Sequence, residues 1–186
     1  MQTEAAKKLF TVDQYHRMAT AGIFTEEDRV ELIEGEILEM PPAGSRHIVC
    51  VNRANALFSS QLPGHAIISV ENPVRLSDYT EPQPDVVLLK PRADYYTAKH
   101  LSAEDTFLVI EIAENSLKYD RNFKLHLYAR SGVPEVWIED LQRNFVLVYR
   151  EPLADSYASS LTLRRGDSLS PLAFPSIVIN VNDLLD

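Results

Sequence analysis

Three parts of the chain are predicted to be helices, from apolar residues at helical spacing or from residues that cap or stop a helix. The clearest stripe runs through the segment 45–61 and the residue that follows it, at Val51, Ala54, Phe58 and Leu62. Residues three or four positions apart share one face of a helix, so this segment is predicted to be a helix with Ser45 as its N-cap. A shorter helix is predicted at 11–22, between a threonine cap and a glycine stop. A third runs from about residue 116 or 120 to 130, where a glycine follows.

Three short apolar runs, at 65–71, 86–90 and 107–113, are rich in β-branched residues. Such runs are typical of strands that are buried on both faces of a sheet. A fourth run, at 135–139, follows the third helix. Between about residues 45 and 140 the order is therefore α-β-β-β-α-β. This order predicts an α/β (or α+β) core in which helices flank a mixed sheet.

Further strands are expected outside this core. Two short alternating runs meet at Glu34-Gly35, which indicates a hairpin with a tight turn. The segments 145–150 and 156–165 predict a second strand pair, and 170–185 a closing strand with a short tail. There is no repeat or linker, so we expect a single domain over 1–186, with its core at about 45–140.

Composition narrows the class of protein. Hydrophobic residues make up 45% of the 186 residues, enough for a full core, and the formal net charge is −9. That charge argues against binding nucleic acid over the whole surface, although a local basic groove can coexist with an acidic exterior. Cys50 is the only cysteine, which excludes an intrachain disulfide, and it is expected to be buried. With no signal peptide and no run of roughly 20 apolar residues, we expect a cytoplasmic protein without a membrane span.

Two acidic residues stand beside apolar strands. Asp85 follows a proline at the start of the run 86–90, and Glu111 interrupts the otherwise apolar run 107–113. Taken alone, Asp85 could simply cap a loop, and Glu111 could face solvent from an edge strand. A carboxylate inside a buried strand is costly unless it is paired or binds a cation. The apolar surroundings of Glu111 therefore favour a functional interpretation.

The third predicted helix adds a lysine to this pair. Asp120, Lys124 and Tyr128 are spaced four apart and share a face, while Phe123 and Leu127 are expected to pack on the sheet. A surface ion pair between Asp120 and Lys124 is the simpler alternative. Together with the two carboxylates, however, the lysine suggests a site for Mg²⁺ or Mn²⁺, which prefer oxygen ligands. Such a cation can activate water and polarise a phosphoryl oxygen, and the lysine can stabilise the developing charge.

Several motifs together resemble one known family. They comprise Glu31 to Gly35, His47, Pro84-Asp85, Glu111, Ser116, Asp120 to Lys124, Tyr128, and Gly132 to Ile138. In this combination the chain resembles, over nearly its whole length, the Uma-two family, which is classed with restriction endonucleases in the PD-(D/E)XK nuclease superfamily.

The resemblance implies the restriction-endonuclease-like fold and a metal site at Asp85 and Glu111. It also implies that Asp85, Glu111 and Lys124 form the catalytic core. The superfamily's lysine two residues after the glutamate is absent, because Ala113 holds that place. In the Uma-two family the lysine comes from the following helix, which here is Lys124.

Other residues are secondary candidates for the site. His47 could face the metal, or it could make a local hydrogen bond at the start of its helix. Glu31 and Glu34 are accessory candidates together with Asp120 and Tyr128, although surface positions on the hairpin are the simpler expectation for both glutamates. Trp137 is expected in the core. The remaining histidines show no metal-ligand spacing: His16, His65, His100 and His126.

The leading hypothesis is a magnesium-dependent endonuclease that hydrolyses DNA phosphodiester bonds. One alternative is a catalytically inactive module that keeps the fold for binding or assembly. Another is a metal-dependent hydrolase of RNA or another phosphoester, since the same core chemistry would serve it. Cutting both strands of a duplex with one site per chain calls for two copies, so a homodimer is expected.

Overall fold

The computed structural model describes residues 6–25 and 27–185. Its central feature is a six-stranded sheet in the order β3-β4-β5-β6-β7-β8. β5 and β6 are parallel, and the other neighbouring strands are antiparallel. The bounds are β3 (Ile67–Val70), β4 (Val86–Leu89), β5 (Thr106–Ala113), β6 (Glu135–Asp140), β7 (Phe145–Leu153) and β8 (Ser156–Arg164). The predicted mixed sheet is confirmed.

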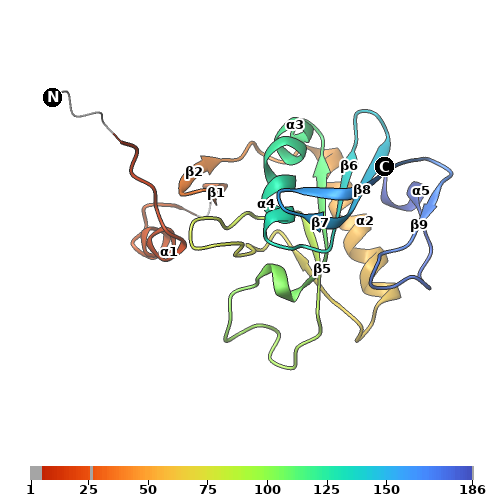
Figure 1. Cartoon of the computed structure of the whole chain (residues 1–186), viewed down its shortest axis with the longest axis horizontal. Coiled ribbons are helices and arrows are strands. Elements are labelled where there is room, and N and C mark those ends of the chain that lie inside the picture. Colours follow the sequence, from red (N-terminus) through yellow and green to blue (C-terminus); the bar gives the residue numbers. More distant parts are fainter. Residues whose placement is uncertain (1–5, 26, 186) are drawn as a thin grey trace.

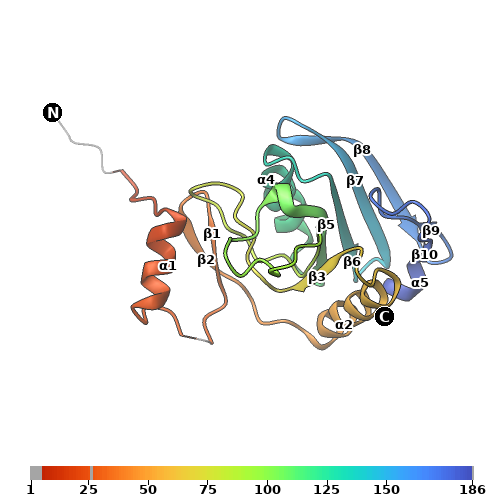
Figure 2. The ribbon, with the colours of Figure 1, turned by 90° about the horizontal axis from the view of Figure 1, so that it is seen from below.

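Helices cover the two faces of this sheet (Figure 2). α2 (Ser45–Gln61) lies on one face, and its predicted apolar stripe is buried in a core that also contains Trp137 and Cys50. The opposite face carries α3 (Leu117–Tyr119), a π-helical turn called η2 (Asp120–Lys124) and α4 (Leu125–Arg130). The predicted order α-β-β-β-α-β is thus confirmed between α2 and β6. The N-cap of α2 is Gly44 rather than the predicted Ser45, and it provides no side-chain cap.

The N-terminal elements lie at one end of the molecule (Figure 1). α1 (Val12–Thr20) begins with a capping box in which Thr11 and Gln14 bond each other's backbone, and β1 (Val30–Ile33) pairs with β2 (Glu36–Glu39). Glu34 and Gly35 both have positive φ, 49° and 82°, as a tight hairpin turn requires. The predicted helix and hairpin are both confirmed.

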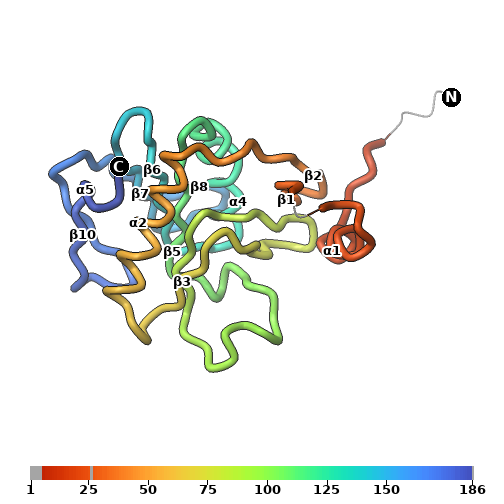
Figure 3. Tube along the Cα trace, turned by 180° about the vertical axis from the view of Figure 1, so that it is seen from behind, coloured from red at the N-terminus to blue at the C-terminus, as the bar shows by residue number. Residues whose placement is uncertain are grey.

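The C-terminal segment lies at the opposite end of the molecule (Figure 3). A closing strand over 170–185 was the expectation, and it is wrong for most of that range. The segment forms only β10 (Ile179–Asn180), which pairs with β9 (Ser168–Leu169), and α5 (Val181–Leu184). Two prolines, Pro171 and Pro175, lack the N–H groups that a longer strand would need. The remaining helical element is the short η1 (Ala103–Asp105), and no described helix is long and apolar enough to span a membrane.

Candidate functional site

One pocket collects most of the predicted site residues. It lies where β4 begins and β5 ends, and it has a volume of about 120 Å³. A water molecule needs roughly 10–15 Å³ on this measure, so the pocket has room for a cation and several waters. Of the residues that the structure describes, only two basic ones, Arg29 and Lys124, line it. Its six acidic residues are Glu31, Glu71, Asp85, Glu111, Glu114 and Asp120. Such an excess of carboxylates is suited to binding a cation.

Asp85 is fixed by the strand next to its own. Its Oδ2 accepts a hydrogen bond from the backbone N–H of Ile112 at 2.6 Å. Its Oδ1 lies 3.1 Å from Nε2 of His47. Asp85 therefore does more than cap a loop, because β5 holds its carboxylate at the sheet end.

Glu111 is buried with two partners from the neighbouring helical segment. The Tyr128 hydroxyl donates a hydrogen bond to Glu111 Oε1 at 2.5 Å, and Lys124 Nζ lies 3.3 Å from the same oxygen. Glu111 is 3% exposed, so the alternative of a solvent-facing edge position is excluded. The predicted lysine and the predicted glutamate thus meet in the folded chain.

Glu31 belongs to this cluster, contrary to the surface position that seemed simpler from the sequence. Its Oε1 accepts hydrogen bonds from Lys124 Nζ at 2.8 Å and from the backbone N–H of Gln83 at 3.3 Å. Its Oε2 is buried and has no hydrogen-bond partner within the described part of the chain. Glu34, the other hairpin candidate, is exposed, pairs with Arg130 and lies outside the pocket.

The π-helical turn η2 positions two of these side chains. Asp120 and Lys124 are its first and last residues, and both are buried rather than paired on the surface. Asp120 accepts a hydrogen bond from the Ser116 hydroxyl at 2.5 Å. The predicted packing of Phe123 on the sheet is wrong, because its side chain is exposed, while Leu127 is buried.

Burial sets the protonation of this cluster. It raises the pKa of Glu111 well above its ordinary value, against the lowering effect of Lys124, and raises that of Asp120 to about 6. Burial alone would lower the pKa of Lys124, but the charges of Glu111, Glu31 and Asp120 outweigh it and raise the pKa. Lys124 therefore stays a cation near neutral pH. It can donate hydrogen bonds and offset negative charge, but it cannot accept a proton.

His47 lies in the same pocket and also makes a local hydrogen bond. Its Nδ1 donates to the backbone carbonyl of Ile112 at 2.9 Å, which turns Nε2 toward Asp85. The Asp85 carboxylate beside Nε2 is the largest cause that raises the pKa of His47. His47, Glu71 and Asp85 each offer one ligand atom, and these atoms lie within 4.8 Å of one another. A metal-binding histidine usually binds the metal with one ring nitrogen while a hydrogen bond fixes the other, as one does here for Nδ1.

Sequence reasoning did not find Glu71 or Glu139. Glu71 follows β3 in an ordinary polar context, so only the fold brings it beside Asp85. Glu139 faces Ile112 across the β5–β6 pair, and its two buried oxygens have no hydrogen-bond partner among residues 6–25 and 27–185. The signal that could have found Glu139 is the one used for Glu111, a carboxylate in an apolar strand.

Comparisons with known proteins show the family and the fold of the chain. The model of the Uma2 family, described as "Putative restriction endonuclease", matches residues 12–182. The chain belongs to the Uma2 family. Among solved structures, this Uma2 protein is similar to a chain described as a putative nuclease belonging to DUF820, from Anabaena variabilis ATCC 29413. The TM-score is 0.71 at 18% identity, over 94% of this chain and 97% of that one, which shows a shared nuclease-like fold. No curated protein matches the chain.

Proposed function

We propose that the protein is a metal-dependent endonuclease that hydrolyses DNA phosphodiester bonds. The observation that carries the proposal is the buried Lys124 ammonium between Glu111 and Glu31, in the pocket that also holds Asp85. A merely structural ion pair would need one carboxylate for one ammonium. Here the carboxylates around Lys124 outnumber its single ammonium group, as expected for a site completed by a divalent ion.

The residues fit a Mg²⁺ or Mn²⁺ ion. Asp85 is the central ligand in this proposal, with Glu111 beside it on β5, and His47 and Glu71 are additional ligands for Mn²⁺ in particular. The unpartnered Oε2 of Glu31 is a further buried acceptor. When bound, such a cation lowers the pKa of water and polarises a phosphoryl oxygen.

Lys124 acts through its permanent charge. Its Nζ already lies within hydrogen-bonding distance of two carboxylates, so a phosphate oxygen or the attacking water can become a further partner of the same ammonium. The ammonium then stabilises the negative charge that develops on the phosphoryl group. Tyr128 holds Glu111, and Ser116 holds Asp120, which keeps the carboxylates in place around Lys124.

The proposed substrate is the phosphate backbone of DNA. Arg29 at the edge of the pocket offers a second positive charge to a phosphate backbone. A symmetric dimer of the chain is the form that would cut both strands of a duplex. RNA and other phosphoesters present the same reacting group, so they are alternative substrates in the test.

The test is cleavage of supercoiled plasmid, and of matched single-stranded DNA and RNA, with Mg²⁺ or Mn²⁺. Glu111→Gln is expected to abolish metal-dependent cleavage while leaving the circular dichroism spectrum unchanged. Glu104→Gln, which removes the same charge from an exposed position in η1, is the matched control and should retain activity. Cleavage by Glu111→Gln at the wild-type rate would refute the assignment. No cleavage of any substrate by the wild type would favour the inactive binding module.

A further inference from the structure

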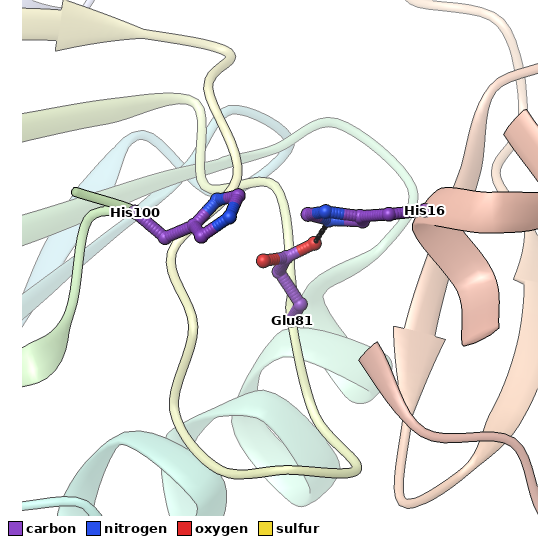
Figure 4. Close-up of side chains that lie close together, drawn as sticks. All are labelled: His16, Glu81 and His100. Atoms are coloured by element: carbon purple, nitrogen blue, oxygen red, sulfur yellow. Dashed lines mark hydrogen bonds and ion pairs between the residues drawn. The ribbon is translucent and has the colours of Figure 1, made fainter. Parts of the chain in front are cut away.

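Two histidines and a glutamate from separate segments converge away from the pocket just described (Figure 4). His16 lies in α1, Glu81 in the segment between β3 and β4, and His100 in the segment between β4 and β5. Each offers one ligand atom, and these atoms lie within 4.8 Å of one another. None of the three lines the pocket at Asp85.

The Glu81 carboxylate is the buried centre of this group. Its side chain is 1% exposed, and its Oε2 lies 2.5 Å from Nε2 of His16. A buried carboxylate requires a positive partner or a metal ion. The imidazole rings of His16 and His100 flank it, with ring centroids 4.9 Å apart. Within the described residues the His100 ring makes no hydrogen bond, so its nitrogens are available to a ligand.

We propose that His16, Glu81 and His100 form a second metal site, for a borderline transition-metal ion of the Zn²⁺ type. Two imidazole nitrogens and one carboxylate are a ligand set that such ions prefer, whereas Mg²⁺ prefers oxygen. Tetrahedral ligands about 2.0–2.1 Å from zinc lie roughly 3.3 Å from one another. Binding such an ion would therefore require His16 and Glu81 to move apart slightly and the exposed His100 ring to turn inward.

The spacing along the chain gave no sign of this site, because each ligand comes from a different segment. That same arrangement gives the metal a structural role. α1 is attached to the rest of the protein by its buried Val12 and a few polar contacts. Two of these are Val12 N–H to the Asp78 carbonyl and the Tyr15 hydroxyl to the Val30 carbonyl. An ion held by His16 and His100 joins α1 to the segment before β5. It thereby supports the hairpin that carries Glu31, since Val30 lies in β1.

The test is calorimetric titration of the full chain with Zn²⁺, together with Co²⁺ absorption and thermal unfolding. His100→Ala and His16→Ala are the variants, and Glu81→Gln keeps the shape of the buried side chain. His65→Ala, another exposed histidine outside the cluster, is the matched control. Asp85→Ala and His47→Ala separate this site from the pocket at the sheet end, which could also bind Zn²⁺.

We expect one equivalent of Zn²⁺ whose affinity falls at least about tenfold in His100→Ala and His16→Ala, since removal of even an outer-shell partner costs 10–100-fold. That equivalent should persist in His65→Ala, Asp85→Ala and His47→Ala. Zn²⁺ should raise the thermal unfolding midpoint of the wild type more than that of His100→Ala. Unchanged Zn²⁺ binding in both His16→Ala and His100→Ala, or binding lost only in Asp85→Ala, would overturn the proposal.

Discussion

Replacing Lys124 with methionine removes a buried charge while it nearly preserves the length of the side chain. The Lys124 side chain is 3% exposed, and its Nζ lies 2.8 Å from Glu31 Oε1 and 3.3 Å from Glu111 Oε1. At an effective dielectric constant of about 20, these separations correspond to roughly 6 and 5 kcal/mol of attraction. The cost of removing the ammonium from water offsets much of that attraction. Loss of one partner from a buried ion pair typically costs about 3–5 kcal/mol, and we expect that loss here.

The assay is urea unfolding at neutral pH without divalent ions. Lys99→Met is the matched control, because Lys99 pairs with Asp105 at 2.8 Å but has a side chain that is 42% exposed. Its loss should stay below about 1 kcal/mol. The double variant Lys124→Met/Glu111→Gln should recover part of the lost stability, since it removes one of the two stranded carboxylates. The reasoning is refuted if Lys124→Met costs no more than Lys99→Met.

Three further predictions concern single side chains. Tyr128→Phe removes the hydroxyl that donates to Glu111 at 2.5 Å, and urea unfolding should show a loss of about 1.5–3 kcal/mol. Burial and the charge of Asp85 raise the pKa of Glu139 to about 8, so the stability from its bound proton is complete below the ordinary value of 4.5 and is lost as the pH rises through about 8. Glu139→Gln should therefore flatten the fall in unfolding free energy between those pH values, and an unchanged pH profile would contradict this. Gly35→Ala should lower thermal stability by about 1 kcal/mol or more, because φ is +82° and a Cβ would lie 2.7 Å from the Leu9 Cβ; a wild-type melting curve would refute it.

The core of the fold could be predicted because its signals are local. The apolar stripe of α2 predicts a helix, and the apolar runs of β4 and β5 predict strands. Neither prediction needs knowledge of what the element packs against. The C-terminal segment resembled a strand by composition, but Pro171 and Pro175 limit its pairing, and only the rest of the fold decides where it lies.

The candidate site was predictable where residue type and context conflict, as for Glu111 in an apolar strand. Glu31 was not placed correctly, because its burial depends on Lys124, which is 93 positions away in the sequence. The π-helical turn was also missed, since no residue type signals it, and so was the exposure of Phe123. The convergence of His16 with His100 was also missed, because it depends on contacts between segments that are distant in the sequence.

A Mg²⁺ titration by calorimetry, on the wild type and on Asp85→Ala, tests the central proposal most directly. Mg²⁺ is the right probe because the proposed second site at His16, Glu81 and His100 should bind it poorly. His100→Ala serves as the control that leaves the pocket at the sheet end intact. Binding to the wild type and to His100→Ala that is lost in Asp85→Ala is the predicted result. Equal Mg²⁺ binding by Asp85→Ala and the wild type would contradict a cation site at Asp85.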